Sequence, residues 1–335
     1  MKVKYVPFQP HCFAYGGFEI QMLSTLEATI KSGVDAEKID IWSRDNDFDI
    51  LHCWGLGFHH YENIRWAKHA KKKVVLTALL SYYENFNEKL RHLFSTYIKK
   101  AQYYIKIANL ADAVVVVNEL QAEACLKYFK VPSHKIHVIP NIVDAKYFDN
   151  KKDNSFSDKY TISDYVLVVG SVCARKNQLA LINACLMANI KLVIIGRLLE
   201  GEEAYGEQID RVIDGNLNII WIKGLLANSD ELISAYKCSA VVALPSYIEQ
   251  QPITLLEAVA VQKPLLIANR AFAKQKYYLN AMCVPPNSVS AIAEGLKLII
   301  GEPSKYIPSL LTMEECREEN VGNMYHQLYK SILKK

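Results

Sequence analysis

The sequence predicts an α/β protein made of two doubly wound domains, each built around a parallel β-sheet. With 335 residues, the chain is long for one such sheet and suits two domains with separate cores. Short apolar runs rich in β-branched residues alternate with longer amphipathic segments, a pattern typical of β-α-β units. This alternation breaks once, near the middle of the chain. Together these observations favour two similar halves joined by a linker.

The expected strands are apolar along their whole length, as in parallel sheets that helices cover on both faces. In the first half they span residues 3–8, 50–54, 74–78, 113–117 and 136–139. In the second half they span residues 166–169, 192–195, 219–222, 240–244 and 265–268. Because doubly wound sheets bind ligands at the carboxyl ends of their strands, the turns after these strands should carry the chemistry.

The polar stretch 149–158 has no hydrophobic periodicity and predicts a linker. We therefore expect a first domain over residues 1–150, a second domain over residues 160–312, and a further helix over residues 313–335.

Composition excludes several classes of protein. A net charge of +4 is too small to indicate nucleic-acid binding, although it fits a polyanionic ligand. The eight cysteines are scattered without metal-ligand spacing, which argues against a zinc site and for a reducing compartment. No stretch reaches the roughly 20 apolar residues that cross a bilayer. We expect a cytoplasmic protein.

The segment after the strand 240–244 is the most informative. The strand ends in Pro-Ser, a loop carries Glu249, and Pro252 opens a helix that contains Glu257. The amides of Ile253 and Thr254, in the first turn of that helix, would stabilise a diphosphate. Carboxylates accept hydrogen bonds from vicinal hydroxyls, so one glutamate suits a sugar and the other a ribose. Taken alone, both could also be solvated carboxylates at a helix end.

Glu249, seven intervening residues, and Glu257 followed by alanine resemble the signature of retaining glycosyltransferase family 4, the glycosyl transferases group 1. Members of this family have the GT-B fold, in which two Rossmann-like domains face each other across a cleft. The resemblance implies that Glu249 faces the donor sugar and that Glu257 binds the ribose of the nucleotide. It also implies that residues 1–150 receive the acceptor and residues 160–312 bind the donor.

The turn after the strand 166–169 resembles the family's basic loop. Lys176 matches the lysine that neutralises the donor diphosphate, and Arg175 would help it; a solvated basic turn is the alternative. Gly170 and Ser171 begin this loop. Three further groups match glycine-rich turns of the family or follow the expected strands. They are Gly16 and Gly17 near the donor, Arg197, Lys223, Gly224 and Leu225 near the base, and His52 and His11 on the acceptor side.

Each of these assignments has a structural alternative. The two N-terminal glycines could form a simple turn, and either histidine could be packed in the core. The helix over 313–335 is expected to pack back on the first domain, as in the family. Residues 88–107 show helical spacing with basic flanks; we expect a packed helix there, with peripheral contact at the inner face of a membrane as the alternative.

The implied reaction moves a sugar from a nucleotide-diphosphate sugar, with UDP-sugar favoured, to a hydroxyl of a glycan or lipid-linked glycan. Surface polysaccharide or glycoconjugate biosynthesis is the expected context. The anomeric configuration is retained, and no cofactor or metal is required. The D-x-D patterns formed by Asp45, Asp47 and Asp49 precede a strand and are interpreted as a loop.

Three departures from the family pattern leave alternatives open. Ser171 stands where arginine is usual, glycine is common at Gln250 and Gln262, and no histidine follows the strand 74–78. A UDP-sugar 2-epimerase on the same fold is one alternative. A non-catalytic subunit that binds a nucleotide-sugar is the other.

Overall fold

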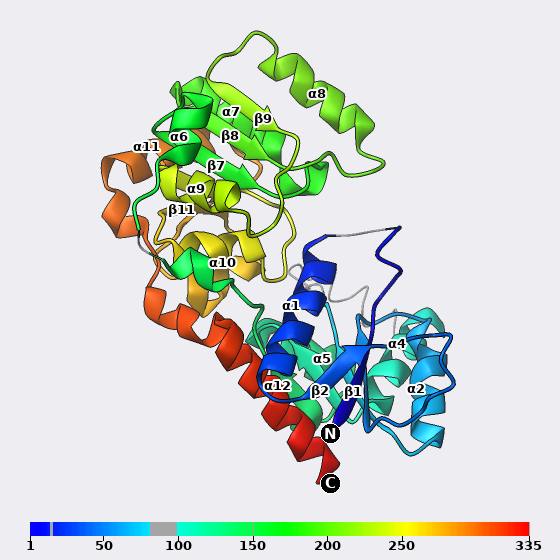
Figure 1. The fold of residues 1–335 in the computed structure, drawn as a ribbon. Helices are drawn as coiled ribbons and strands as arrows, with labels where there is room; N and C mark the ends of the chain where they lie inside the picture. Colours follow the sequence, from blue (N-terminus) through cyan, green and yellow to red (C-terminus); the bar gives the residue numbers. More distant parts are fainter. Residues whose placement is uncertain (14–15, 81–98, 150, 335) are drawn as a thin grey trace. The chain divides into compact units, whose positions relative to one another are not determined.

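The structure, a computed structural model, describes residues 1–13, 16–80, 99–149 and 151–334 (Figure 1). It divides into two compact units, one formed by Met1–Ile142 with Glu315–Lys335 and the other by Val143–Glu314. The expected helix over 88–107 lies partly outside the described residues. Its remainder belongs to α4 (Lys99–Leu110).

The first unit is built on a parallel six-stranded sheet of order β2-β1-β3-β4-β5-β6. Its strands are β1 (Lys2–Val6), β2 (Asp35–Lys38), β3 (Ile50–Trp54), β4 (Lys73–Thr77), β5 (Ala113–Val116) and β6 (Ile136–Val138). Side chains of β3, β4 and β5 are almost all buried, because helices cover both faces of the sheet.

One face of this sheet is covered by α1 (Gly17–Lys31) and α12 (Glu318–Leu333), which lie side by side (Figure 1). The other face is covered by α2 (His60–His69), α4 and α5 (Glu119–Tyr128). Residues of α12 therefore complete a core whose strands lie almost 200 residues or more earlier in the sequence. The apolar positions Val321, Tyr325, Leu328 and Ile332 form its buried stripe.

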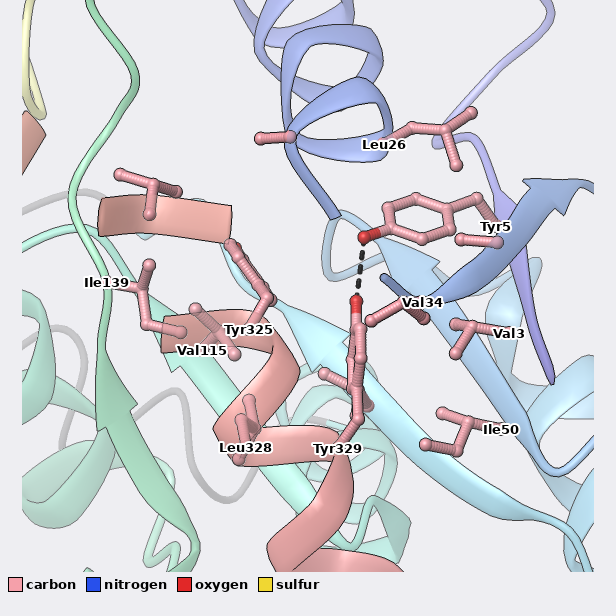
Figure 2. Close-up of a cluster of buried hydrophobic side chains, with 14 of the residues drawn as sticks. Val3, Tyr5, Leu26, Val34, Ile50, Val115, Ile139, Tyr325, Leu328 and Tyr329 are labelled. Carbon is pink, nitrogen blue, oxygen red and sulfur yellow. Dashed lines mark hydrogen bonds between the residues drawn. The ribbon is translucent and has the colours of Figure 1, made fainter. Parts of the chain in front are cut away.

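A chain of buried hydrogen bonds joins α12 to the sheet. The hydroxyls of Tyr5 and Tyr329 lie 2.7 Å apart (Figure 2). The Tyr329 hydroxyl also lies 2.7 Å from Nδ1 of His52, whose Nε2 lies 2.8 Å from the Thr77 hydroxyl. Every polar atom of this group has a partner, as burial in an apolar core requires.

The second unit is built on a parallel six-stranded sheet of order β12-β11-β10-β7-β8-β9. Its strands are β7 (Tyr165–Val169), β8 (Lys191–Ile195), β9 (Ile219–Ile222), β10 (Val241–Leu244), β11 (Leu265–Ala268) and β12 (Met282–Val284). Its helices are α6 (Ser155–Tyr160), α7 (Gln178–Ala188), α8 (Glu203–Ile213), α9 (Asp230–Cys238), α10 (Ile253–Ala260) and α11 (Val289–Gly301).

Short 3₁₀ turns connect these elements, and two of them contribute to the site. They span Ser133–Lys135, Ala145–Phe148, Ala174–Lys176, Ala271–Lys274, Lys276–Tyr278, Pro303–Tyr306 and Leu310–Cys316. In the described ranges, no helix combines the length and apolar character needed to cross a membrane.

The structure differs from the expectations at three places. The edge strands β2 and β12 were not predicted, and α6 lies within the expected linker and extends past its end. Phe156 explains α6: its side chain is buried, and its backbone amide is bonded to the Ser234 hydroxyl of α9 at 3.0 Å. A single buried aromatic residue is too weak a periodic signal to predict a helix.

Candidate active site

The candidate site of the second unit lies where β7 and β10 end. These strands are neighbours in the parallel sheet, so the turns that follow them emerge at the same edge. The turn after β7 carries Arg175 and Lys176, and the loop after β10 carries Glu249.

Asn177 fixes the basic turn to the end of β10. Its backbone is left-handed, with φ of 62°, a conformation that asparagine tolerates. Its side-chain amide donates to the carbonyls of Pro245, at 3.1 Å, and Pro286, at 2.8 Å. The Tyr247 amide donates to the Arg175 carbonyl at 2.9 Å. The two loops are thereby held as one structure.

One carboxylate oxygen of Glu249 forms ion pairs with both cations of the basic turn. Its Oε1 lies 3.1 Å from Nζ of Lys176 and 3.2 Å from Nη1 of Arg175. The Glu249 and Lys176 side chains are only 8% and 11% exposed. Arg175, which is 43% exposed, also donates to the Ile248 carbonyl at 2.5 Å. In such an arrangement, a bound phosphate can replace the carboxylate as the partner of the two cations.

Glycine is required where the Lys176 side chain crosses the strand end. Gly170 has φ of +128°, and a Cβ there would lie 3.0 Å from Nζ of Lys176. A Cβ at Gly196, after β8, would lie 1.9 Å from the Gly170 carbonyl oxygen. Ser171 follows Gly170 and is exposed, and its carbonyl accepts from the Gln178 side chain at 3.0 Å.

The start of α10 presents unsatisfied polar groups. Among the described residues, the amides of Ile253 and Thr254 have no intrahelical acceptor, as expected for the first turn of a helix. The hydroxyls of Thr254 and Ser246 are buried and have no hydrogen-bond partner in the same described part of the chain. Several donors therefore converge at this helix start, where the helix dipole favours an anion.

Glu257 lies one turn further along α10 and is buried. Its Oε2 accepts a hydrogen bond of 2.7 Å from the Tyr236 hydroxyl of α9. Burial, the largest cause, raises the pKa of the Glu257 carboxyl to about 7, and Asp144 adds to the rise. Tyr236 is a residue that the sequence analysis missed, because nothing in the sequence of α9 indicates that this buried side chain meets Glu257.

The residues expected near the base follow β8 and β9. Gly224 has φ of +116°, and a Cβ there would lie 3.1 Å from Cγ of Arg197, so these two residues are adjacent. Nζ of Lys223 lies over the ring of Trp221 and 3.4 Å from Oδ1 of Asp210. The indole of Trp221 donates to the Gly196 carbonyl at 2.8 Å. Leu225 is half-buried beside them in sequence.

The residues of the first unit that were expected at the site lie in different environments. Gly16 precedes α1, and its amide donates to the Glu19 carboxylate at 2.9 Å, while Gly17 is the first residue of the helix. His11 is half-buried. His52 is fully buried with both ring nitrogens hydrogen-bonded, so it is the packed histidine of the alternative interpretation and not a surface group. Burial lowers its pKa to about 3 and keeps the ring neutral.

Comparison with known families gives a consistent result for both halves of the chain. The family described as Glycosyltransferase Family 4 matches residues 24–147, and the family described as Glycosyl transferases group 1 matches residues 149–309. The chain belongs to these GT-B glycosyltransferases. The predicted membership of this family is therefore confirmed.

One curated relative of this glycosyltransferase is an uncharacterized glycosyltransferase from Methanocaldococcus jannaschii. The two are 26% identical over 217 residues, which is 60% of this chain and 54% of the relative. The chain thus matches about half the length of that protein.

Solved structures share the fold of this glycosyltransferase. The Anabaena protein HepE in complex with UDP has a TM-score of 0.76 at 13% identity, covering 99% of this chain and 100% of its own. HepE has also been solved with UDP-glucose. Sucrose-phosphate synthase from Thermosynechococcus elongatus has a TM-score of 0.75 at 14% identity, covering 99% of both chains. These likenesses confirm the predicted GT-B fold.

The acidic loop before β3 has ordinary structural partners in this glycosyltransferase. Lys2 forms an ion pair with Asp47, and its amide donates to Asp49 at 2.8 Å. The Asp47 amide donates to the Asp45 carboxylate at 2.9 Å. Within the residues that the structure describes, no three histidine, cysteine, aspartate or glutamate side chains are grouped as a metal site would need.

Proposed function

We propose that this glycosyltransferase moves a sugar from a UDP-sugar to a hydroxyl of a glycan or lipid-linked glycan, with retention of the anomeric configuration. The observation that carries the proposal is the pair of cations, Arg175 and Lys176, that Glu249 holds where β7 and β10 end. The first unit would bind the acceptor and the second unit the donor.

Lys176 has the position and charge to neutralise the diphosphate. When the bond between the anomeric carbon and the diphosphate oxygen breaks, negative charge accumulates on that oxygen. A buried ammonium stabilises such charge far better than water does. Arg175 would assist from the more exposed side of the loop. The amides of Ile253 and Thr254 would bind the remaining phosphate oxygens.

Glu249 would exchange its cations for hydroxyls of the donor sugar. In this proposal the diphosphate takes over Lys176 and Arg175, and the released carboxylate orients the sugar. The acceptor hydroxyl forms its bond to the anomeric carbon on the face that the diphosphate leaves, and its proton passes to the leaving phosphate oxygen. No protein nucleophile is needed. The cationic side chains and helix amides would fill the role that a metal has in other transferases.

The choice of UDP is supported by the relatives, since HepE has been solved with UDP and with UDP-glucose. The acceptor class and a place in surface polysaccharide or glycoconjugate biosynthesis rest on the resemblance. We propose a cytoplasmic protein. Two cations of α2, Lys68 and Arg65, are paired with Asp112 and Glu62 and so are not free to contact anionic lipid.

The test is a thermal-shift screen of the protein with UDP, GDP, ADP and their common sugar conjugates. A ligand that binds the folded state raises the melting temperature. We expect UDP and a UDP-sugar to stabilise the wild type and Lys297→Gln, an exposed lysine on α11, and to stabilise Lys176→Gln much less. Stabilisation by no nucleotide at millimolar concentration would refute the donor site.

Reaction products then separate transfer from its alternatives. NMR of the incubated donor, with and without a panel of acceptors, identifies the product and its anomer. Conversion of the UDP-sugar without acceptor into its 2-epimer would contradict the proposal in favour of an epimerase. Binding without turnover under every acceptor would favour a non-catalytic subunit.

A further inference from the structure

Two buried tyrosines, Tyr236 and Tyr147, lie beside Glu257. Tyr236 of α9 is fully buried, and its hydroxyl donates to Oε2 of Glu257 at 2.7 Å. Tyr147, in the 3₁₀ turn Ala145–Phe148, is also fully buried, and the two rings pack edge to face with centroids 5.6 Å apart.

Tyr147 has an unusual feature for a buried residue. Its hydroxyl has no hydrogen-bond partner within the described part of the chain. It nevertheless lies close to the Glu257 carboxyl. That carboxyl raises the pKa of the Tyr147 hydroxyl, and the hydroxyl lowers the pKa of the carboxyl. A buried hydroxyl without a hydrogen bond destabilises the folded state, so its presence beside a carboxyl calls for a functional reason.

The carboxyl has one oxygen occupied and one available. Oε2 accepts the hydrogen bond from Tyr236, which leaves Oε1 as the oxygen that can meet a ligand. Glu257 is 7% exposed, so its side chain retains only a small surface open to a ligand. A carboxylate held by one oxygen presents the other in a fixed direction.

We propose that Tyr236 and Tyr147 are positioning residues for the Glu257 carboxylate. Tyr236 holds Oε2, and Tyr147 packs against the Tyr236 ring, so that Oε1 accepts hydrogen bonds from the ribose hydroxyls of the donor. This inference rests on the proposed function, in which Glu257 binds the ribose. It adds two residues, from α9 and from the turn Ala145–Phe148, to the determinants of ribose recognition.

The test measures binding of UDP and of 2′,3′-dideoxy-UDP by isothermal titration calorimetry. Tyr236→Phe should bind UDP roughly tenfold more weakly than the wild type, the size expected when an outer partner of a liganding group is lost. The same variant should bind 2′,3′-dideoxy-UDP as the wild type does, because that ligand has no hydroxyls for Glu257. A general structural defect would weaken both ligands equally.

Tyr165→Phe is the matched control. Tyr165 is fully buried in the same unit, and its hydroxyl donates to the Ala235 carbonyl at 2.7 Å, so this hydrogen bond does not involve Glu257. It should leave the ratio of the two affinities unchanged. Tyr147→Phe removes the hydroxyl that interacts with the Glu257 carboxyl and keeps the ring that packs on Tyr236. It should therefore fold as the wild type does and lose affinity for UDP but not for the dideoxy analogue.

Glu257→Gln separates this inference from the proposed function. If Glu257→Gln reduces the preference for UDP over its dideoxy analogue and the two tyrosine variants do not, the ribose role of Glu257 stands and the positioning role is wrong. If Glu257→Gln leaves the preference unchanged, or if UDP does not bind the wild type, both are wrong.

Discussion

The ammonium of Lys176 lies 3.1 Å from Oε1 of Glu249, and both side chains are almost completely withdrawn from solvent. Removing one partner of such a buried ion pair leaves an uncompensated charge, which costs far more than an exposed pair would. The ion pair therefore couples the basic turn after β7 to the loop after β10. A diphosphate that binds Lys176 must compete with Glu249 for it.

Lys176→Gln should reduce kcat by about 10²–10³-fold, the usual effect of losing one group that stabilises developing charge. Lys297→Gln, which removes an exposed lysine of α11, should have no effect. Steady-state kinetics with the donor identified by the thermal-shift screen provide the measurement. Equal rates for Lys176→Gln and the wild type would show that this cation takes no part in the reaction.

Glu257 should make the protein less stable as the pH rises. Its folded-state pKa of about 7 lies above the ordinary value of 4.5. Between these values the unfolded chain loses a proton that the folded protein keeps, so stability falls from pH 4.5 to 7 and then levels off. Relative to the wild type, Glu257→Gln should gain up to roughly 3 kcal/mol over this range.

Urea unfolding of both proteins at pH 5, 6 and 7.5 measures this difference. A difference that stays constant with pH would mean that Glu257 titrates normally. Glu294→Gln, at an exposed position of α11, serves as the control and should show no comparable gain.

His52 should contribute stability that acid removes. Its folded-state pKa of about 3 is below the ordinary value of 6.5, so the unfolded chain takes up a proton that the folded protein refuses. This stability is complete above pH 6.5 and declines as the pH falls toward 3, by up to about 5 kcal/mol. The variant His52→Gln should be less stable at pH 7.5 but lose less stability between pH 6.5 and 4.5.

Tryptophan fluorescence during urea unfolding is suited to this measurement, since three of the four tryptophans belong to the first unit. An equal loss of stability on acidification in the wild type and in His52→Gln would contradict the prediction.

Tyr329→Phe should also destabilise the first unit, by about 1–3 kcal/mol, because it leaves Tyr5 and His52 without their shared partner.

Gln262→Gly should stabilise the second unit. Gln262 ends α10 in the left-handed conformation, with φ of 56°, which costs a residue with a Cβ about 1 kcal/mol. Glycine adopts this conformation without strain, whereas Gln262→Ala keeps the Cβ and should bring no gain. The comparison of both variants by urea unfolding isolates the backbone effect. Equal stabilities for glycine and alanine would refute it.

The interior strands could be predicted from sequence because they are buried on both faces. Tyr165–Val169 and Val241–Leu244 are apolar without interruption, which few other local structures require. The edge strand β2, with the sequence Asp-Ala-Glu-Lys, has one partner and mostly exposed side chains, so its composition resembles a loop.

The candidate site was predictable where its residues belong to sequence motifs that follow strands. Glu249, Glu257 and Lys176 follow strands whose order sets their neighbourhood. The environment of His52 was not predictable, because its partner Tyr329 lies 277 residues away and reaches it only after α12 has packed on the sheet. The same reason hid Tyr236 and Tyr147, whose meeting with Glu257 depends on three separate segments.

The position of α12 has a consequence for how the chain is made. Residues 143–314 form one continuous unit, whereas the first unit needs residues 315–335 to cover one face of its sheet. During synthesis, the second unit can therefore finish folding while the first still exposes the apolar surface that Val321, Tyr325 and Tyr329 will cover. The segment translated first is the segment completed last, and a nascent chain arrested before residue 315 would present that uncovered face to chaperones.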